Sequence, residues 1–347
     1  MARIYNTFEF TGHLGLGKEP FKEKVFDSGW TKHTYQFVIN EAKNNGVFVG
    51  LEGGLHKAKA NVVHSFTKGI GGEKGAKIQI PWDDRLSNST VDMIPDFKKT
   101  LIDLTEDKET LHDYYNTKRE VYNLESKEEA LTSDEEIKLG GLYNKAREQA
   151  PHRYEFVHTY DAIQFLQSNI EKYKGRKFKV KGNVEVSRWK DKVYRNYVPQ
   201  SIELVSEEEP NGLYAEVDLH FTKDAIDQKD FREDKKVYIE TYILSYDSQA
   251  KKDIFFPFNT VINAGKLDLE NEQHMKRVDF LKRFFDGVKK DKVHHIPYKV
   301  SVFRGADTVE FTADQLTDSQ KEMIEFGMAK LSDFAPKGGL LGETVEE

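Results

Sequence analysis

The sequence contains no cysteine. This absence excludes disulfides, thiolate zinc sites and cysteine nucleophiles, and it is typical of a chain that works in a reducing cytoplasm. Long apolar runs are also missing, since none approaches the ~20 residues that a membrane-spanning helix needs. The first residues, Met1 to Tyr5, lack the apolar segment of a signal peptide. We therefore expect a cytoplasmic protein with no membrane partner.

An excess of positive charge is lacking too, because the formal net charge is −7. This excludes a uniformly basic nucleic-acid coat but leaves room for a local basic face, because binding responds to the local field. Disordered chains are poor in aromatic residues, whereas this one has 23 Phe and 16 Tyr. Its 347 residues are about twice the length of a typical domain, so two folded domains with charged surfaces are expected.

The hydrophobic pattern indicates strands in two regions, from Ile4 to about Leu86 and from Lys177 to Ile262, where apolar and polar residues alternate. The Asn-Gly pairs in Asn44-Asn45-Gly46 and Asn211-Gly212 predict a hairpin in each region. The region between them is charged and rich in helix formers, and it carries a capping box at Thr132-x-x-Glu135. Further apolar stripes at helical spacing lie at residues 162–173 and 272–290. The chain is therefore predicted to be mainly β with helical insertions, in the α+β class.

A weak internal repeat connects the two strand regions. The pattern Phe8-x-Phe10-x-Gly12 resembles Phe178-x-Val180-x-Gly182. Two further matches follow in the same order along the chain. Gly46–Val49 resembles Gly212–Ala215, and Lys77–Ile80 resembles Lys236–Ile239. Three matches in order favour two copies of one small β-unit. A long first strand with a central glycine, followed by a β-meander, suits a five-stranded OB barrel. A generic antiparallel sandwich would produce the same alternation and stays open as an alternative.

These patterns predict two OB-like β-barrels joined by a helical segment. The expected division is a first barrel over residues 1–100, a helical connector over 101–171, a second barrel with an inserted helix over 172–311, a C-terminal helix over 312–335, and a flexible acidic tail over 336–347.

The segment from Lys172 to Arg195 has the most informative composition. It holds ten Lys or Arg residues against only Glu185 and Asp191, and aromatic residues are interleaved with them. Trp189 is expected at the tip of a hairpin, between Arg188 and Lys190. Cations that follow a phosphate backbone, together with rings that each stack a base for about 1–3 kcal/mol, are typical of single-strand binding. The alternative is a solvated strand face with Trp189 folded back onto the barrel.

With this hairpin, the bent glycine strand and the duplicated β-unit, the chain resembles the OB-fold single-stranded DNA-binding proteins, particularly those of bacteriophage replication modules. The resemblance covers roughly residues 3–86 and 172–265. It implies a non-catalytic protein of DNA replication, recombination or repair, located in the host cytoplasm if a phage encodes it. The composition does not distinguish DNA from RNA. The residues expected to bind nucleic acid are Trp30, Tyr35, Lys57, Lys59, Lys179, Lys181, Arg188, Trp189, Lys190, Lys192, Tyr194, Arg195 and Tyr197.

The C-terminal tail departs from the family that the chain resembles. Bacterial members end in an acidic run closed by Pro-Phe, which docks partner proteins, whereas this chain ends Thr344-Val345-Glu346-Glu347. Contact with replication proteins through the tail is therefore weakly indicated. An oligomer is compatible with the sequence, and no cofactor is expected.

Two other classes of function stay open. The β-units would also suit a structural or assembly protein of a virion. A metal-dependent nuclease is suggested by Asp96, Glu106 and Lys108, but that chemistry needs Glu-x-Lys on a core strand, and residues 104–111 are too polar for one. The histidines, including His294 and His295, lack the spacing of metal ligands, so neither a metal site nor a catalytic site is predicted.

Overall fold

The computed structural model describes residues 6–106, 108–189, 192–290 and 292–303, together with Lys321, Ile324 and the backbone of Val345–Glu346. Strands make up 42% and helices 27% of the structure, which confirms a mainly β chain with helices. The predicted C-terminal helix at 312–335 lies outside the described residues, apart from Lys321 and Ile324. Among the described residues, no helix combines the length and apolar character needed to cross a membrane.

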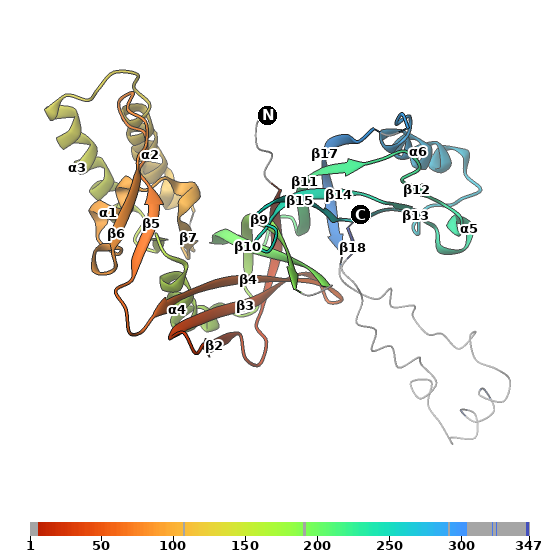
Figure 1. Ribbon diagram of the computed structural model, residues 1–347, viewed down its shortest axis with the longest axis horizontal. Coiled ribbons are helices and arrows are strands. Elements are labelled where there is room, and N and C mark those ends of the chain that lie inside the picture. The colour runs from red at the N-terminus through yellow and green to blue at the C-terminus, as the bar shows by residue number, and fades with distance from the viewer. Residues whose placement is uncertain are drawn as a thin grey trace.

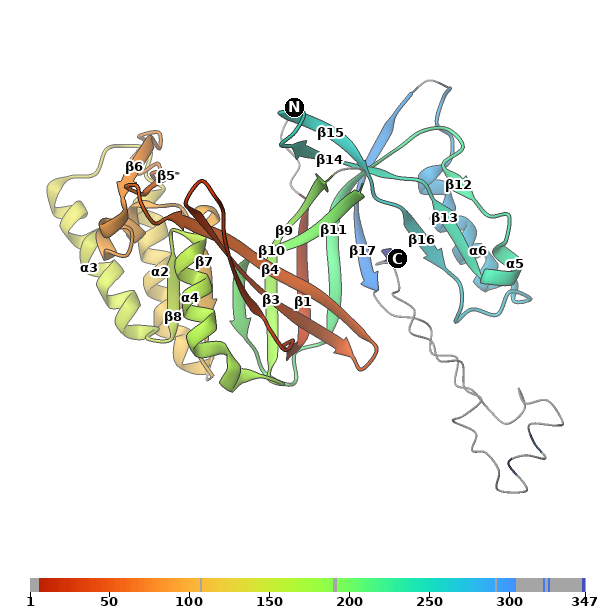
Figure 2. The same ribbon diagram turned by 60° about the horizontal axis from the view of Figure 1, so that its bottom comes forward.

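Three regions follow one another along the long axis of the molecule (Figures 1 and 2). The helices α2 (His112–Glu125) and α3 (Ser133–Gln149) lie at one end, and α6 (Glu272–Lys282) lies at the other. The centre is formed by strands from both predicted β-regions. The molecule is therefore built around a central sheet, with a mainly helical body on one side and a mixed α/β part on the other.

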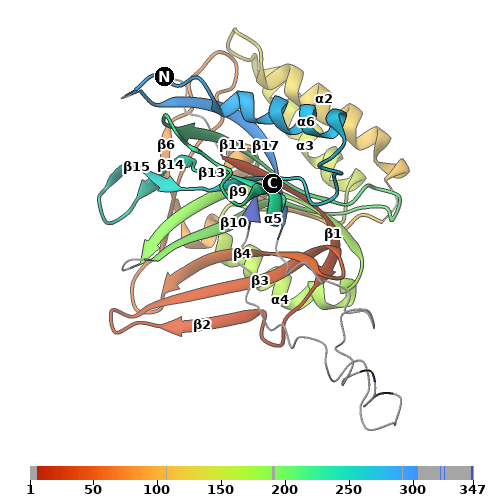
Figure 3. The same cartoon turned by 90° about the vertical axis from the view of Figure 1, so that its right-hand side faces the viewer.

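The N-terminal strands form an antiparallel meander. Its members are β1 (Thr7–Gly15), β2 (Phe21–Val25), β3 (Trp30–Ala42) and β4 (Asn45–His56). The turn between β3 and β4 falls at Lys43–Asn44, so the hairpin expected at Asn44-Asn45-Gly46 is confirmed. β3 pairs with β1, β2 and β4, and Figure 3 shows β2, β3 and β4 side by side at one side of the molecule.

Residues 57–158 form an insertion between β4 and the rest of the central sheet. Its elements are β5 (Val62–Phe66), β6 (Lys77–Pro81), η1 (Trp82–Asp84), α1 (Asn88–Met93), η2 (Asp96–Lys98), β7 (Thr100–Asp103), η3 (Glu109–Leu111), α2, α3 and β8 (Arg153–Phe156). The capping box at Thr132 and Glu135 begins α3 as predicted. Within the described residues β5 and β6 pair only with each other, whereas β7 joins the central sheet beside β10 (Lys192–Leu204). The chain then enters α4 (Thr159–Asn169) and η4 (Ile170–Tyr173), which lie against β3 and β4.

The pairing of β9 (Lys177–Trp189) differs from the predicted division. This strand was expected to open a second barrel, yet it pairs antiparallel with β1 over seven residue positions and forms a hairpin with β10 (Lys192–Leu204). The two similar motifs are thus neighbours in one sheet, with Gly12 opposite Phe178 and Gly182 opposite Phe8. Strands that pair share the same alternation, and this explains why the sequence pattern read as a repeat.

The remaining strands continue from β1 toward the C-terminal side. They are β11 (Gly212–Phe221), β12 (Ile226–Asp227), β13 (Lys236–Ile239), β14 (Tyr242–Asp247), β15 (Lys252–Pro257), β16 (Thr260–Asn263), β17 (His294–Phe303) and β18 (Val345–Glu346), with helices α5 (Phe231–Asp234), α6 and η5 (Arg283–Phe285). β11 pairs with β1, β14 and β17, so the hairpin predicted at Asn211-Gly212 is wrong. β18 pairs with β16 and β17, which gives these two residues of the predicted flexible tail a place in the sheet.

One large hydrophobic core joins the central and C-terminal strands. It contains Phe10, Phe178, Phe221 and Phe258, each fully buried, so both predicted β-regions contribute to the same core. Smaller clusters hold the insertion together, one of them around Val121 and Leu142 between α2 and α3. The hydrogen-bonded strands form an open sheet, and their pairing does not by itself establish the two closed barrels expected from the sequence.

Candidate functional site

The face of β2, β3 and β4 that points away from α4 carries the strongest combination of exposed rings and cations. Alternate residues of β3 are buried, among them His33, which contacts Tyr160 and Gln164 of α4. The residues between them therefore point outward. We call this surface the outer face. It comprises Lys22 and Lys24 of β2, Phe26 of the following turn, Trp30, Lys32, Thr34, Gln36 and Val38 of β3, and Phe48, Gly50 and Glu52 of β4.

Three aromatic side chains of the outer face are exposed. Trp30 is 39%, Phe26 38% and Phe48 47% exposed. The backbone N–H of Phe26 donates to the Trp30 carbonyl, so these two rings sit across from one another at the β2–β3 turn. Phe48 lies opposite Val38, eight residues along β3 from Trp30. At about 3.3 Å per residue, the rings span about 26 Å of strand.

Two glycines leave positions on the outer face of β4 without side chains. Gly50 lies between two buried residues and opposite Gln36, and Gly54 lies opposite Lys32. A Cβ built on Gly54 would lie 2.7 Å from the Trp30 ring, so that ring rests on bare backbone. A ring supported from below by backbone, with its other side open, is a platform on which a planar group can stack.

The cations of the outer face lie mainly on β2. Lys22 and Lys24 are exposed, and within the described chain neither has an acidic partner at ion-pair distance. The Nζ of Lys24 lies 4.9 Å from the centre of the Phe26 ring, a cation–π contact. Lys32 is paired with Glu52 at 2.5 Å. The lysines of β2 can therefore interact with an anion, whereas the charge of Lys32 is compensated by Glu52 on β4.

The side of the outer face toward β9 is acidic. The pKa of Glu185 is raised, first by its partial burial and then by the nearby charge of Glu52. Glu52 is itself paired with Lys32, so Glu185 adds the uncompensated negative charge on this side.

Two lysines of β9, within the predicted basic segment Lys172–Arg195, have acidic partners. Lys179 is paired with Glu209 and Lys181 with Glu9, the latter at 3.0 Å. The hydrogen bond from Lys179 to Glu209 raises the pKa of the lysine. Because these charges are already compensated, they offer a phosphate backbone less than the sequence suggests.

The arginines of the β9–β10 hairpin contact the C-terminal part of the molecule. Arg188 is paired with Asp247 at 2.8 Å, and the Arg195 guanidinium lies 4.6 Å from the centre of the Phe258 ring. The pKa of Asp247 is lowered, mainly by the backbone N–H of Ala250, with Gln249 and Arg188 adding to the effect. Both arginines predicted to bind nucleic acid thus contact other strands of the protein.

The remaining predicted residues divide into three groups. Tyr35 and Tyr197 are core residues, 2% and 5% exposed, so in this structure neither ring is accessible to a base. Burial raises the pKa of Tyr35 to about 12. Tyr194 is 44% exposed. Lys192 and Lys59 are exposed as well, and Lys57 is paired with Glu23 at 3.3 Å. The Trp189 side chain and Lys190 lie outside the described residues.

Sequence reasoning named Trp30 but missed Phe26, Phe48, Lys22 and Lys24. The available signal was strand periodicity. Trp30 and Tyr35 are five residues apart and so point to opposite faces of a strand. An even spacing from Trp30 would have selected Lys32 and Thr34 in place of Tyr35.

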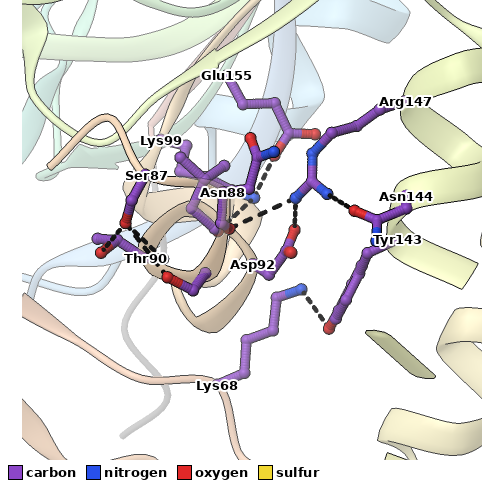
Figure 4. A network of polar contacts seen from close by, with 12 residues as sticks. Lys68, Ser87, Asn88, Thr90, Asp92, Lys99, Tyr143, Asn144, Arg147 and Glu155 are labelled. Atoms are coloured by element: carbon purple, nitrogen blue, oxygen red, sulfur yellow. Dashed lines mark hydrogen bonds and ion pairs between the residues drawn. The ribbon is translucent and has the colours of Figure 1, made fainter. Parts of the chain in front are cut away.

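A second concave site lies in the insertion. A cavity of about 270 Å³ is lined by residues from α1, α2, α3 and β8. Most of its cations are paired with acids, as Figure 4 shows for Arg147 with Asp92, while Lys118 has no ion pair within the described residues. Lys68 lies 2.8 Å from Glu125, and Lys99 lies 2.5 Å from Glu155. Because these pairs compensate one another, the network fastens the helices to β8 and leaves little net charge for an anion.

The residues of the nuclease pattern have separate partners. Asp96 is paired with Lys99 at 2.9 Å, Lys108 with Asp103 at 3.1 Å, and Glu106 with Arg176 at 3.4 Å. Asp96 lies in η2, while Glu106 follows β7. Their placement does not supply the shared carboxylate site that two-strand metal nucleases need.

No known family model matches the chain, and no curated protein matches its sequence. Among solved structures, a deletion mutant of the single-stranded DNA-binding protein from Thermus aquaticus is similar over 88% of this chain and 89% of its own, with 8% identity and a TM-score of 0.29. A TM-score of 0.29 is too low to establish a common fold.

Proposed function

We propose that the chain binds single-stranded DNA without catalysing a reaction, and that the outer face of β2–β4 is the binding surface. The observation that carries the proposal is the group of exposed rings, Phe26, Trp30 and Phe48, beside the unpaired Lys22 and Lys24. Rings with an open side stack bases, and cations beside them neutralise phosphates. Base stacking is tolerant of sequence, so we expect general single-strand binding with little preference among bases.

The order of the strands supports an OB arrangement for this surface. An OB unit has five strands in the spatial order 1-2-3-5-4-1 with a helix between the third and fourth. The elements β1, β3, β4, α4, β9 and β10 follow this chain order. β1 pairs with β3 and β9, β9 pairs with β10, and β10 lies near β4. On this proposal the second and third strands are β3 and β4, whose outer surface binds oligonucleotides in OB folds.

The C-terminal strands support a second unit of the same order. β11 pairs with β14 and β17, β13 pairs with β16, α6 precedes β17, and β18 pairs with both β17 and β16. The proposed units are then residues 7–56 with 159–204, and residues 212–303 with Val345–Glu346. The boundaries at 100 and 172 expected from the sequence are replaced, because β9 and β10 belong with β1. The insertion 57–158 becomes an addition to the first unit.

A role in replication, recombination or repair is the proposed setting, because exposed single strands arise in each of these processes. The alternative of an assembly protein predicts an extended apolar surface. The exposed apolar side chains in the insertion, such as Phe97 at 67% and Ile137 at 75%, are separated by charged residues. Scattered exposed apolar residues are normal on a protein surface, so this alternative has the weaker support.

The test is a titration of the full chain with labelled oligo-dT, oligo-rU and duplex DNA at low salt, followed by fluorescence anisotropy. Phe48→Ala serves as the outer-face variant and Phe97→Ala as the control at an exposed phenylalanine of the insertion. We expect saturable binding to oligo-dT, weaker binding to the duplex, and a loss of affinity in Phe48→Ala alone. Equal binding to duplex and single strand, or equal affinities for the two variants, would contradict the proposal.

A further inference from the structure

Two histidines and a buried aspartate meet on the C-terminal side of the central sheet, away from the outer face. His220 of β11 lies directly opposite His295 of β17, and Asp218 precedes His220 by two residues on the same strand. Residues two apart on a strand share a face, so the three side chains gather over one patch of the β11–β17 ladder. One potential ligand atom from each lies within 4.8 Å of the other two.

The two distances from the histidines to Asp218 are close to those of a tetrahedral metal site. The His295 Nδ1 is 2.9 Å from one carboxylate oxygen of Asp218, and the His220 Nε2 is 3.5 Å from the other. Zinc bonds to nitrogen and oxygen are about 2.0 Å long, which places neighbouring ligands of a tetrahedron about 3.3 Å apart. The two imidazole rings are nearly parallel, with centroids 5.3 Å apart, so one ring must turn about its side-chain bonds for both to point a nitrogen at the same ion.

A backbone hydrogen bond orients one ring. The His220 Nδ1 lies 3.0 Å from the carbonyl oxygen of Asp218. A carbonyl only accepts hydrogen bonds, so Nδ1 is the donor in this contact, and Nε2 is the ring nitrogen that faces the carboxylate. Metal-bound histidines commonly donate their other N–H to a backbone carbonyl in this way.

The surroundings favour one open coordination position. Asp218 is buried and His220 is mostly covered, with the Phe255 ring 5.0 Å from its own. The side chain of His295 is 56% exposed, so the cluster opens to solvent on that side. Three protein ligands and one accessible position form the arrangement in which zinc retains a water molecule.

From this geometry we propose that Asp218, His220 and His295 form a binding site for a divalent transition-metal ion of the zinc class. Imidazole ligands favour zinc, cobalt, nickel and copper, whereas magnesium and calcium prefer oxygen ligands alone. The ion would replace the proton that His295 shares with the carboxylate and would join β11 to β17. The sequence predicted no metal site, because Asp218 and His295 are far apart in the chain and meet only through strand pairing.

The matched control is the neighbouring histidine of the same strand. His294 of β17 lies opposite Phe221 of β11, and its side chain lies on the opposite face of the sheet from that of His295. The experiment uses the full chain without a histidine tag and titrates Zn²⁺ by calorimetry and Co²⁺ by visible absorption. The variants are His295→Ala and His294→Ala, with circular dichroism as the check on folding.

We expect one Zn²⁺ per chain, visible Co²⁺ bands of tetrahedral type, and affinity at least tenfold weaker in His295→Ala but unchanged in His294→Ala. Saturating Zn²⁺ should raise the melting temperature of the wild-type chain and of His294→Ala, since an ion bound only to the folded state stabilises it. If His295→Ala fails to fold, His295→Gln takes its place in the same titrations. Equal affinities for the wild-type chain and the His295 variant, or the absence of Zn²⁺ binding at millimolar concentration, would overturn the proposal.

Discussion

Replacing Trp30 by alanine provides the sharpest test of the outer face. The ring is 39% exposed, and its covered side rests on Gly54. Its removal opens no closed cavity, so the folded state should persist. A stacked base contributes about 1–3 kcal/mol, and 1.4 kcal/mol is a factor of ten in affinity. We therefore expect Trp30→Ala to bind oligo-dT about 5-fold to 150-fold more weakly than the wild-type chain.

The measurement is fluorescence anisotropy with a labelled oligo-dT at fixed low salt, and thermal melting checks folding. Trp30→Phe keeps a ring over Gly54 and should recover most of the affinity. Phe97→Ala removes an exposed ring from the insertion and should leave binding unchanged. If a folded Trp30→Ala protein binds as tightly as Phe97→Ala, then the ring is no platform and the outer face is not the binding surface.

Three further predictions concern charge, burial and packing. The double variant Lys22→Gln, Lys24→Gln should reduce the slope of log affinity against log salt concentration for oligo-dT by about 1.4, at ~0.7 per lost phosphate contact. The control, Lys138→Gln with Lys145→Gln, removes two exposed lysines of α3 and should keep the wild-type slope. An unchanged slope in the β2 variant would mean that the DNA binds elsewhere. The side chain of Asp103 is 1% exposed and accepts contacts from Arg153, Lys108 and Thr105. These contacts outweigh the effect of burial and lower the pKa of Asp103. Asp103→Ala should therefore lower the free energy of unfolding, measured in urea, by about 3–5 kcal/mol. Because folding favours the carboxylate, the stability that Asp103 contributes is fully present above its unfolded pKa of about 3.9 and is lost as the pH falls through the folded pKa. If the unfolding free energy of Asp103→Ala changes with acid as that of the wild-type chain does, this assignment is refuted. Gly182→Ala would drive its Cβ into the carbonyl oxygen of Val198 and should destabilise the chain by about 1–3 kcal/mol, whereas Gly140→Ala, which meets nothing within 4 Å, should not destabilise it.

The sequence was a good guide to strands and helices and a poor guide to their partners. Alternation identifies a strand because successive side chains point to opposite faces, and this located β1, β3 and β9. It says nothing about which strands pair. The motifs at Phe8 and Phe178 look alike because the two strands cover one core side by side, so this match reflects a pairing within one sheet.

The candidate site shows the same limit in its side chains. Trp30 was predicted and is exposed, whereas Tyr197 was predicted and is buried. Tyr194 and Tyr197 are three residues apart, so only one of them can face the solvent on a strand. The ion pairs of Lys179 and Lys181 involve Glu209 and Glu9, which a local count of charge could not associate with them. Pairing across strands thus decides which charges are free.

The insertion between β4 and α4 sets the order in which this protein can assemble on the ribosome. β1 is made first, but β9, its longest partner, begins only at residue 177, and β11 begins at residue 212. The N-terminal meander therefore leaves the ribosome with unpaired edges while the insertion is synthesised. The clusters between α2 and α3 draw on residues within the insertion and need nothing downstream. The later part of the chain can thus acquire structure before the earlier part, and truncation before β10 should leave a folded insertion attached to strands prone to aggregation.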